Sequence, residues 1–144
     1  MLADASRSFK VFANGSLLDA EIRSSVNPTL VGNDTAFAPD YLVRTGFLFD
    51  SAKWNAALTA TLVGDQYWQD SNLPRGSGVS EIEAEIPAYE VVDFSLEYRP
   101  SDKWAVHGGI NNMFNQDYFS RVRNDGIEPA LERTFYVGVR FDIR

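Results

Sequence analysis

The stretch TFYVGVRFDI, residues 134–143, alternates between two kinds of side chain from end to end. Successive side chains of a β-strand point to opposite faces, so this order gathers the aliphatic and phenylalanine side chains on one face. The pattern predicts a β-strand with one apolar face throughout. That face carries Phe135, Val137, Val139, Phe141 and Ile143, and the opposite face carries Thr134, Tyr136, Gly138, Arg140 and Asp142.

The same period of two recurs upstream, and few windows have the period of a helix. In residues 89–99, Val92, Phe94, Leu96 and Tyr98 alternate with polar side chains, which strongly fixes the register of that strand. We therefore predict an all-β, antiparallel up-and-down fold of about six strands. The predicted strands cover residues 8–22, 40–50, 53–67, 89–99, 103–114 and 132–143.

Short and long connections alternate along the chain. Residues 50–53 and 100–102 make short turns, whereas 23–39, 68–88 and 120–131 are long, polar and rich in turn-forming residues. An up-and-down barrel with tight periplasmic turns at one end and long extracellular loops at the other produces this order.

Aromatic residues collect near the predicted strand ends and suggest two belts at membrane interfaces. The alternative is ordinary cross-strand aromatic packing in a soluble sheet, because the alternation does not show which face of the sheet contacts water. One predicted belt, beside the short turns, contains Phe49, Trp54, Tyr98 and Trp104; the other, near the long loops, contains Tyr67, Trp68, Tyr89, Phe114, Tyr118 and Phe119.

Composition narrows the function classes. The net charge of -7, with no cluster of Lys and Arg, argues against nucleic acid as a partner. The absence of cysteine excludes disulfides, thiolate metal sites and a cysteine nucleophile. No apolar run reaches the length of a membrane-spanning helix, and the N-terminus lacks the apolar region of a secretory signal. An exported protein would therefore require a longer chain than this one.

Two stretches near the C-terminus resemble a known family. GGINNMFNQDYF, residues 108–119, is similar to the Gly-x-x-Asn-Asn-hydrophobic-Phe-x-x-x-Tyr sequence at the penultimate strand of TonB-dependent receptors. EPALERTFYVGVRFDI, residues 128–143, resembles that family's closing strand. Further similarities lie at 86–93, 63–67 and 38–41, in the family's order, so the resemblance covers nearly the whole chain.

The resemblance implies an outer-membrane barrel of 22 strands around an N-terminal plug, which takes up ferric siderophores, ferric citrate or similar scarce nutrients with energy from the TonB complex. On this interpretation, residues 1–144 are the C-terminal part of the barrel domain, without the plug or the TonB-contacting segment. The expected partners are outer-membrane lipid, the remaining strands and plug, the TonB complex and a ferric siderophore. One departure is that Phe141 is not the last residue, as the terminal aromatic residue of such barrels commonly is.

No residue pattern points to catalysis, a cofactor or a metal centre. His107 is the only histidine and has no nucleophile motif around it, so it is expected to be a polar residue facing the barrel lumen. Glu97, Arg99, Arg140 and Asp142 are assigned to a charged ladder along that lumen. Ligand binding is assigned to the loops at 23–39, 68–88 and 120–131, with no single residue nominated.

Two alternatives remain beside the receptor hypothesis. A soluble antiparallel β-barrel that binds a small apolar ligand would use Phe94, Leu96 and Val139 as its core, whereas in the membrane barrel they face lipid. An outer-membrane enzyme is disfavoured, because no acid–base pair or nucleophile stands in a recognisable setting.

Overall fold

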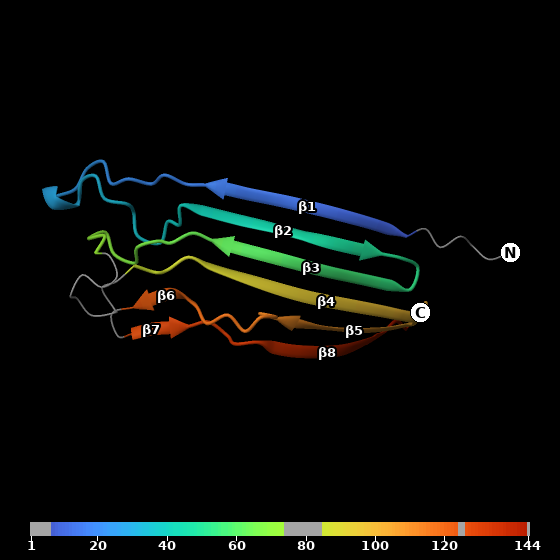
Figure 1. Ribbon diagram of the computed structural model, residues 1–144. Coiled ribbons are helices and arrows are strands. Elements are labelled where there is room, and N and C mark those ends of the chain that lie inside the picture. Colours follow the sequence, from blue (N-terminus) through green and yellow to red (C-terminus); the bar gives the residue numbers. More distant parts are fainter. Residues whose placement is uncertain (1–6, 74–84, 124–125, 144) are drawn as a thin grey trace.

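The computed structural model describes residues 7–73, 85–123 and 126–143. It has the predicted antiparallel architecture, drawn in Figure 1. Six strands form one sheet in the order β1-β2-β3-β4-β5-β8, so each strand lies beside its neighbour in an up-and-down meander. The strands are β1 (Ser8–Leu17), β2 (Tyr41–Asp50), β3 (Trp54–Val63), β4 (Tyr89–Ser101), β5 (Trp104–Asn111) and β8 (Thr134–Phe141).

The connections alternate in length as the sequence predicts. Residues 51–53 join β2 to β3, and residues 102–103 join β4 to β5, both at the end of the sheet where the described chain begins and ends (Figure 1). The long connections all lie at the opposite end. One of them contains the single-turn helix η1 (Pro28–Leu30). In the described part of the chain, no helix is both long enough and apolar enough to cross a membrane.

Three of the predicted strands end three or more residues too late, and one of these is the third strand, which is predicted to reach residue 67 and stops at Val63. The first strand stops at Leu17 instead of residue 22, because the chain leaves the sheet there and makes only an isolated bridge between Glu21 and Asp34. The fifth strand stops at Asn111 because Asn112 adopts a left-handed backbone conformation, with φ of 51°. Such a residue turns the chain out of the extended conformation.

The segment 120–131 is not the plain loop that the sequence predicts. It contains most of a second sheet, formed by β6 (Phe119–Arg123) and β7 (Gly126–Pro129). Val122 of this hairpin packs in a small buried core with Trp68 and Ile86 from the preceding long connection. The hairpin forms because distant residues bury its apolar side chains, and its own pattern is too short to reveal it.

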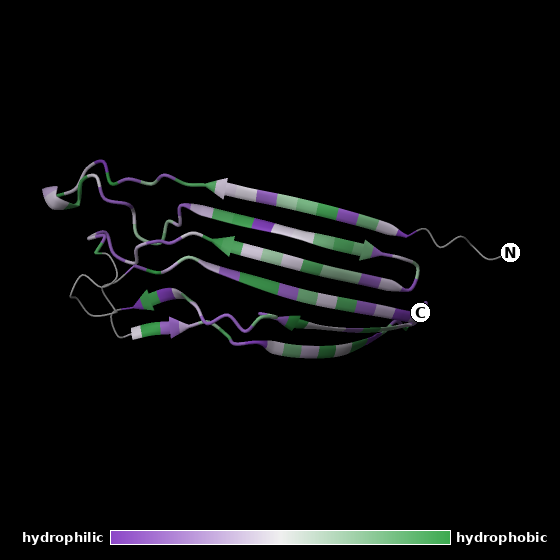
Figure 2. Ribbon diagram, in the orientation of Figure 1, coloured by the Kyte–Doolittle hydropathy of each residue, from purple (hydrophilic) through white to green (hydrophobic). Residues whose placement is uncertain are grey.

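Strand pairing brings side chains of one kind together on each face of the six-stranded sheet. Phe94 of β4 lies opposite Leu58 of β3 and Ile110 of β5, and Val137 of β8 lies opposite Gly108 of β5. These positions share the apolar face, whereas Glu97 and His107 pair with each other on the polar face. The alternating colours along each strand in Figure 2 follow this division.

On the polar face, aromatic rings lie over glycines of the neighbouring strand. A Cβ atom at Gly46 would come within 2.9 Å of the ring of Phe12, and one at Gly138 within 2.5 Å of Nε2 of His107. Glycine at these positions makes room for the ring, which is a recurring way to stabilise a strand interior that lacks a side chain.

Candidate functional site: two faces and two ends of one sheet

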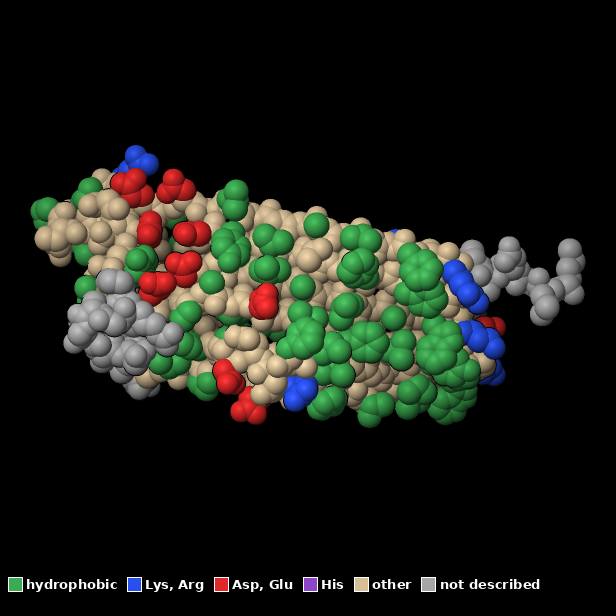
Figure 3. All heavy atoms as spheres, in the orientation of Figure 1, with side chains coloured by type: hydrophobic (Ala, Val, Ile, Leu, Met, Phe, Trp, Pro, Cys, Tyr) green, Lys and Arg blue, Asp and Glu red, His purple; other side chains and the backbone are tan. Residues whose placement is uncertain are grey.

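The apolar face is largely exposed in this six-stranded sheet. Phe9 and Val137 are each 79% exposed and Val11 is 70% exposed, and apolar side chains occupy this face in every strand from β1 to β8, with Glu90 of β4 as a charged residue toward the long-loop end. Figure 3 shows hydrophobic side chains gathered along the strands, with charged groups mainly at the two ends. An apolar surface of this extent marks contact with a membrane or a large partner.

Three cross-strand aromatic pairs cross the short-turn end of this face. We call them the aromatic belt. Each pair joins residues that lie directly opposite each other in neighbouring strands. The belt consists of Phe9 with Phe49, Trp54 with Tyr98, and Trp104 with Phe141, whose ring centroids are 4.9, 4.2 and 4.5 Å apart.

The predicted second belt, near the long loops, is wrong for Trp68, Tyr89 and Tyr118, whereas Phe114 is 74% exposed. Trp68 is only 8% exposed and lies in the core beneath the β6–β7 hairpin. Tyr89 lies on the polar face, where its ring stacks on that of Tyr118 at 4.4 Å. These aromatic side chains pack the long connections onto the sheet, a role that spacing along the sequence does not distinguish from an interface belt.

The charged ladder predicted on the polar face is present near the short turns. Arg99 lies 3.8 Å from a carboxylate oxygen of Glu97 and 3.7 Å from one of Asp50. Glu97 also lies 3.4 Å from Arg140, which approaches Asp142 at 3.9 Å. Arg99 further donates a hydrogen bond of 2.9 Å to Oδ1 of Asn55. The charged residues of this network come from β2, β4 and β8 and from the residue that follows β8. Their positive and negative charges therefore neutralise one another.

A cavity of about 520 Å³ lies beside this ladder, mostly on the polar face. Its walls mix charged, amide and hydroxyl groups, and His107 reaches it from β5. His107 covers Gly138 across the strand pair, which explains its position through packing. Among the polar residues that line the cavity are Lys10, Asp50, Asn55, Ser95, Glu97 and His107.

The long connections contact one another at the far end of the sheet. Nδ2 of Asn33 donates a hydrogen bond of 2.8 Å to the carbonyl of Asp70, and the amide of Phe37 donates one of 2.7 Å to the carbonyl of Tyr67. Val122 joins the third connection to the second through the buried core. The structure thus gathers the described parts of the predicted ligand loops, 23–39, 68–88 and 120–131, at one end.

Carboxylates surround Tyr67 in this loop region. Burial is the largest cause that raises the pKa of the Tyr67 phenol, and the negative charges of Glu85 and Asp34 raise it further. Loss of the phenolic proton is disfavoured because the anion would be both desolvated and next to like charge.

The motif at 108–119 has a structural role that the sequence does not reveal. Asn112 is 3% exposed, and its Oδ1 accepts a hydrogen bond from the amide of Gln116 while its Nδ2 donates to the Gln116 carbonyl, both at 2.8 Å. Its own amide donates to Oδ1 of Asp93 at 2.9 Å. The side chain therefore closes a tight loop at the end of β5.

A second cavity, of about 550 Å³, opens beside this loop. The stacked rings of Tyr89 and Tyr118 form part of its wall, and Gln116, Asp117 and Glu132 supply polar groups. Among the described residues, no group of three His, Asp or Glu side chains has the arrangement of a metal site.

Comparison with known proteins agrees with this architecture. Residues 3–113 match the family model described as "TonB dependent receptor-like, beta-barrel". The vitamin B12 transporter BtuB of Photobacterium profundum is 31% identical over 91 residues, which are 60% of this chain and 14% of BtuB.

Solved structures of receptors share the fold. The unliganded ferric citrate transporter FecA superposes with a TM-score of 0.79 at 24% identity, over 92% of this chain and 21% of that chain. The ferric yersiniabactin uptake receptor FyuA from Yersinia pestis superposes with a TM-score of 0.75 at 18% identity, over 99% of this chain and 22% of FyuA. The chain thus spans about a fifth or less of the length of these proteins, which are transporters and receptors and not enzymes.

Proposed function

This chain belongs to the TonB-dependent receptor-like family of β-barrels, and from that premise we propose that its sheet is one sector of a closed barrel in the outer membrane of a Gram-negative bacterium. The complete barrel takes up a ferric siderophore or a similar scarce nutrient. Residues 1–144 supply the C-terminal strands of the barrel domain, and the plug and the TonB-contacting segment belong to the rest of the receptor.

The exposed apolar face is the observation that carries the proposal. Val137 and Phe9, each 79% exposed, lie on the two outermost strands, so the apolar wall continues to both edges of the sheet. Backbone groups at an open edge have no partners inside a bilayer, so further strands must pair with β1 and β8. Closing the sheet into a barrel pairs these edges and places the apolar wall against lipid.

The aromatic belt supports the same placement through strand tilt. Phe49 pairs with Ala56, which is two residues farther from the turn than Trp54, and Tyr98 pairs with Val106, two residues farther than Trp104. The belt therefore steps by two residues for every two strands. With a rise of about 3.3 Å per residue and about 4.8 Å between strands, this step corresponds to a tilt of about 35°. Membrane barrels have tilts of about 35–45°.

The soluble-barrel alternative loses support from the same arrangement. It would enclose the apolar face and expose the charged ladder of Glu97, Arg99 and Arg140 to bulk water. In the sheet, that ladder lies beside the cavity of the polar face, and aromatic rings of the polar face lie over Gly46 and Gly138. A polar, charged interior and an apolar exterior are the arrangement of an outer-membrane barrel.

Two ligand classes are supported by named relatives. Ferric siderophore uptake is supported by the structural similarity to FecA and FyuA, and vitamin B12 uptake by the sequence similarity to BtuB. We assign ligand contact to the gathered loops at 23–39, 68–88 and 120–131, which lie on a rigid sheet, as binding loops commonly do.

An uptake assay tests the assignment. Deletion of the complete receptor gene should abolish uptake of at least one radiolabelled ferric siderophore under iron limitation and leave cobalamin uptake unchanged. Loss of the TonB complex should also abolish uptake of that siderophore. Loss of cobalamin uptake alone would shift the assignment to the vitamin. Normal uptake of every siderophore and of cobalamin in the deletion strain would contradict the proposed function.

A further inference from the structure

The two short turns share one sequence pattern. Ser51-Ala52-Lys53-Trp54 and Ser101-Asp102-Lys103-Trp104 each place a serine, a lysine and a tryptophan in the same order. In each turn the tryptophan begins a strand and pairs with an aromatic residue of the next strand, Tyr98 or Phe141. We call these two segments the Lys-Trp turns.

One backbone hydrogen bond is common to both turns, although the serines bond differently: Oγ of Ser51 accepts from the amide of Trp54, and Oγ of Ser101 accepts from the amide of Lys103. The amide of Arg99, the residue after Tyr98, donates to the carbonyl of Lys53 at 2.8 Å. The amide of Asp142, the residue after Phe141, donates to the carbonyl of Lys103 at 3.0 Å. Each lysine backbone is therefore anchored to the following strand at a fixed height relative to the aromatic belt.

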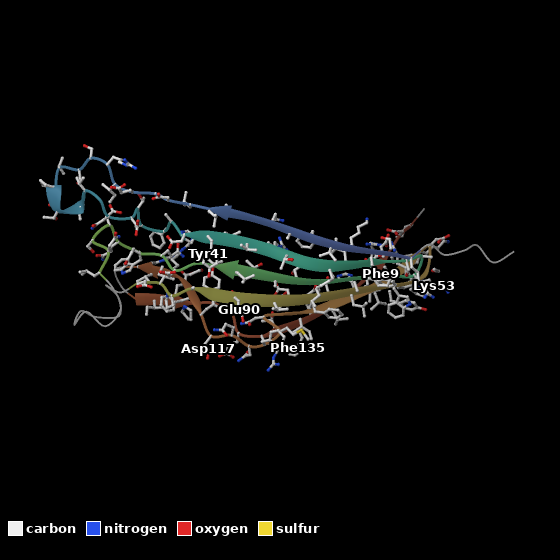
Figure 4. The ribbon with its side chains drawn as sticks, turned by 45° about the horizontal axis from the view of Figure 1, so that its top comes forward. Phe9, Tyr41, Lys53, Glu90, Asp117 and Phe135 are labelled. Atoms are coloured by element: carbon white, nitrogen blue, oxygen red, sulfur yellow. The ribbon has the colours of Figure 1, made fainter. Side chains whose placement is uncertain are left out.

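The two lysine side chains are exposed and uncompensated. In the described part of the chain, neither Lys53 nor Lys103 forms an ion pair, although the neighbouring Arg99 and Arg140 both do. Lys53 lies at the short-turn end with Phe9, as Figure 4 shows. A cavity of about 590 Å³ opens between the turns, with Lys53 and Trp104 in its wall.

Along the barrel axis, the apolar face is followed by the tryptophans and then by the lysines. A phospholipid has the matching order of acyl chains, glycerol region and phosphate. Trp54 and Trp104 lie at the rim of the apolar face, 42% and 48% exposed, and each lysine lies one residue farther out. Amphipathic aromatic rings prefer the level of the headgroups, and lysine side chains extend from an apolar surface to a charged layer. Of the acidic residues near the cavity, Asp142 faces Arg140, and Asp102 forms no ion pair with either turn lysine.

We propose that each Lys-Trp turn binds the phosphate of an anionic phospholipid headgroup in the leaflet at the short-turn end, with the lysine as the cation and the tryptophan against the glycerol region. This inference rests on the proposed function, since it requires the apolar face to meet lipid. The repeated turn thus anchors the barrel at a defined depth through two headgroup contacts.

Native mass spectrometry of the complete receptor, titrated in detergent with dioleoyl-phosphatidylglycerol, tests this binding. The variants are Lys53→Gln, Lys103→Gln and the double variant, with Lys10→Gln on the polar face as the matched control. We expect the affinity to fall about fivefold for each turn lysine removed, the fold-change of roughly 1 kcal/mol per basic residue at an anionic surface. The control should bind as the wild type does, and Lys→Arg variants at both turns should retain binding.

Dioleoylglycerol, which has the same chains and no phosphate, should bind the wild type and the double variant equally. Unchanged phosphatidylglycerol binding by the double variant would overturn the inference. Heat-modifiable electrophoretic mobility reports separately whether each variant forms a barrel. A folded barrel without lysine-dependent lipid binding leaves the proposed function intact, whereas a wild-type receptor that never forms a membrane barrel removes the proposed function itself.

Discussion

Asn112 and Gln116 bind each other twice: Oδ1 of Asn112 accepts from the Gln116 amide, and Nδ2 of Asn112 donates to the Gln116 carbonyl, each at 2.8 Å. The same Nδ2 also donates to the carbonyl of Leu131 at 3.3 Å. One buried side chain therefore ties the end of β5 to the segment that leads into β8, and gives a physical reason for an asparagine at this point of the motif.

Asn112→Ala should destabilise the folded barrel by about 1–3 kcal/mol, because the buried Asn112 side chain loses its hydrogen bonds to Gln116 and Leu131. Alanine also fits poorly at the φ of 51°, whereas glycine tolerates it. Asn112→Gly should therefore be less destabilising than Asn112→Ala by about 1 kcal/mol. Urea unfolding followed by tryptophan fluorescence measures both. Equal stability of the two variants would show that the backbone conformation contributes nothing.

His107 and Gly138 should be coupled through packing. A Cβ atom at Gly138 would meet the His107 ring first, at 2.5 Å from Nε2. Gly138→Ala should therefore cost about 1–3 kcal/mol by overpacking, and the double variant His107→Ala with Gly138→Ala should recover part of that loss. A double-mutant cycle of unfolding free energies measures the coupling, and strictly additive effects would contradict the contact.

Tyr67 should lose its proton later than an ordinary tyrosine. Its pKa is raised above 10.0 chiefly by burial and further by Glu85 and Asp34, so the folded state holds the proton more tightly than the unfolded state. The stability that this provides is present below pH 10 and is lost as the pH rises through the folded-state pKa. Phenolate absorbance in an alkaline titration should lose one late-titrating component in Tyr67→Phe. Asp34→Asn should move that component to lower pH, and no movement would contradict a charge effect from Asp34.

Arginine substitutions at two adjacent residues of β3 should differ strongly in their effect on folding free energy. Leu58 lies on the apolar face, four residues and about 13 Å along the strand from the belt residue Trp54, close to the middle of an apolar band about 25 Å tall. Leu58→Arg should cost about 2–4 kcal/mol of folding free energy in lipid. Thr59→Arg, on the polar face, is the matched control and should be nearly neutral. Equal losses in assembled barrel would exclude this assignment of the faces.

Much of the sheet could be predicted because its information is local. The alternation of Phe94 with Ser95, and of Val137 with Gly138, contains the strand, its register and its two faces. The Gly, Pro, Asn and Asp residues between strands predict which connections are long. The turn lengths and the order of the six strands follow from the same pattern.

The features that could not be predicted depend on contacts between distant residues. The β6–β7 hairpin needs Trp68 and Ile86 to bury Val122, and a strand of five residues carries no such signal by itself. The stacking of Tyr89 on Tyr118 likewise joins residues far apart along the chain. The alternation predicts the charged ladder as a set, but not the neighbours that hold Arg99 in place, Asp50 and Asn55. The assignment of ligand contact to the long loops stays a prediction.

Spin-label accessibility in the complete receptor, reconstituted in lipid vesicles, tests the two faces most directly. The chain has no cysteine, so Val137→Cys on the apolar face and Ser95→Cys beside the polar-face cavity can each be labelled selectively. The label at residue 137 should collide with oxygen dissolved in the bilayer and be shielded from a water-soluble nickel chelate, and the label at residue 95 should show the reverse. Nickel access at residue 137 with oxygen access at residue 95 would contradict the account, because the apolar face would then meet water and not lipid.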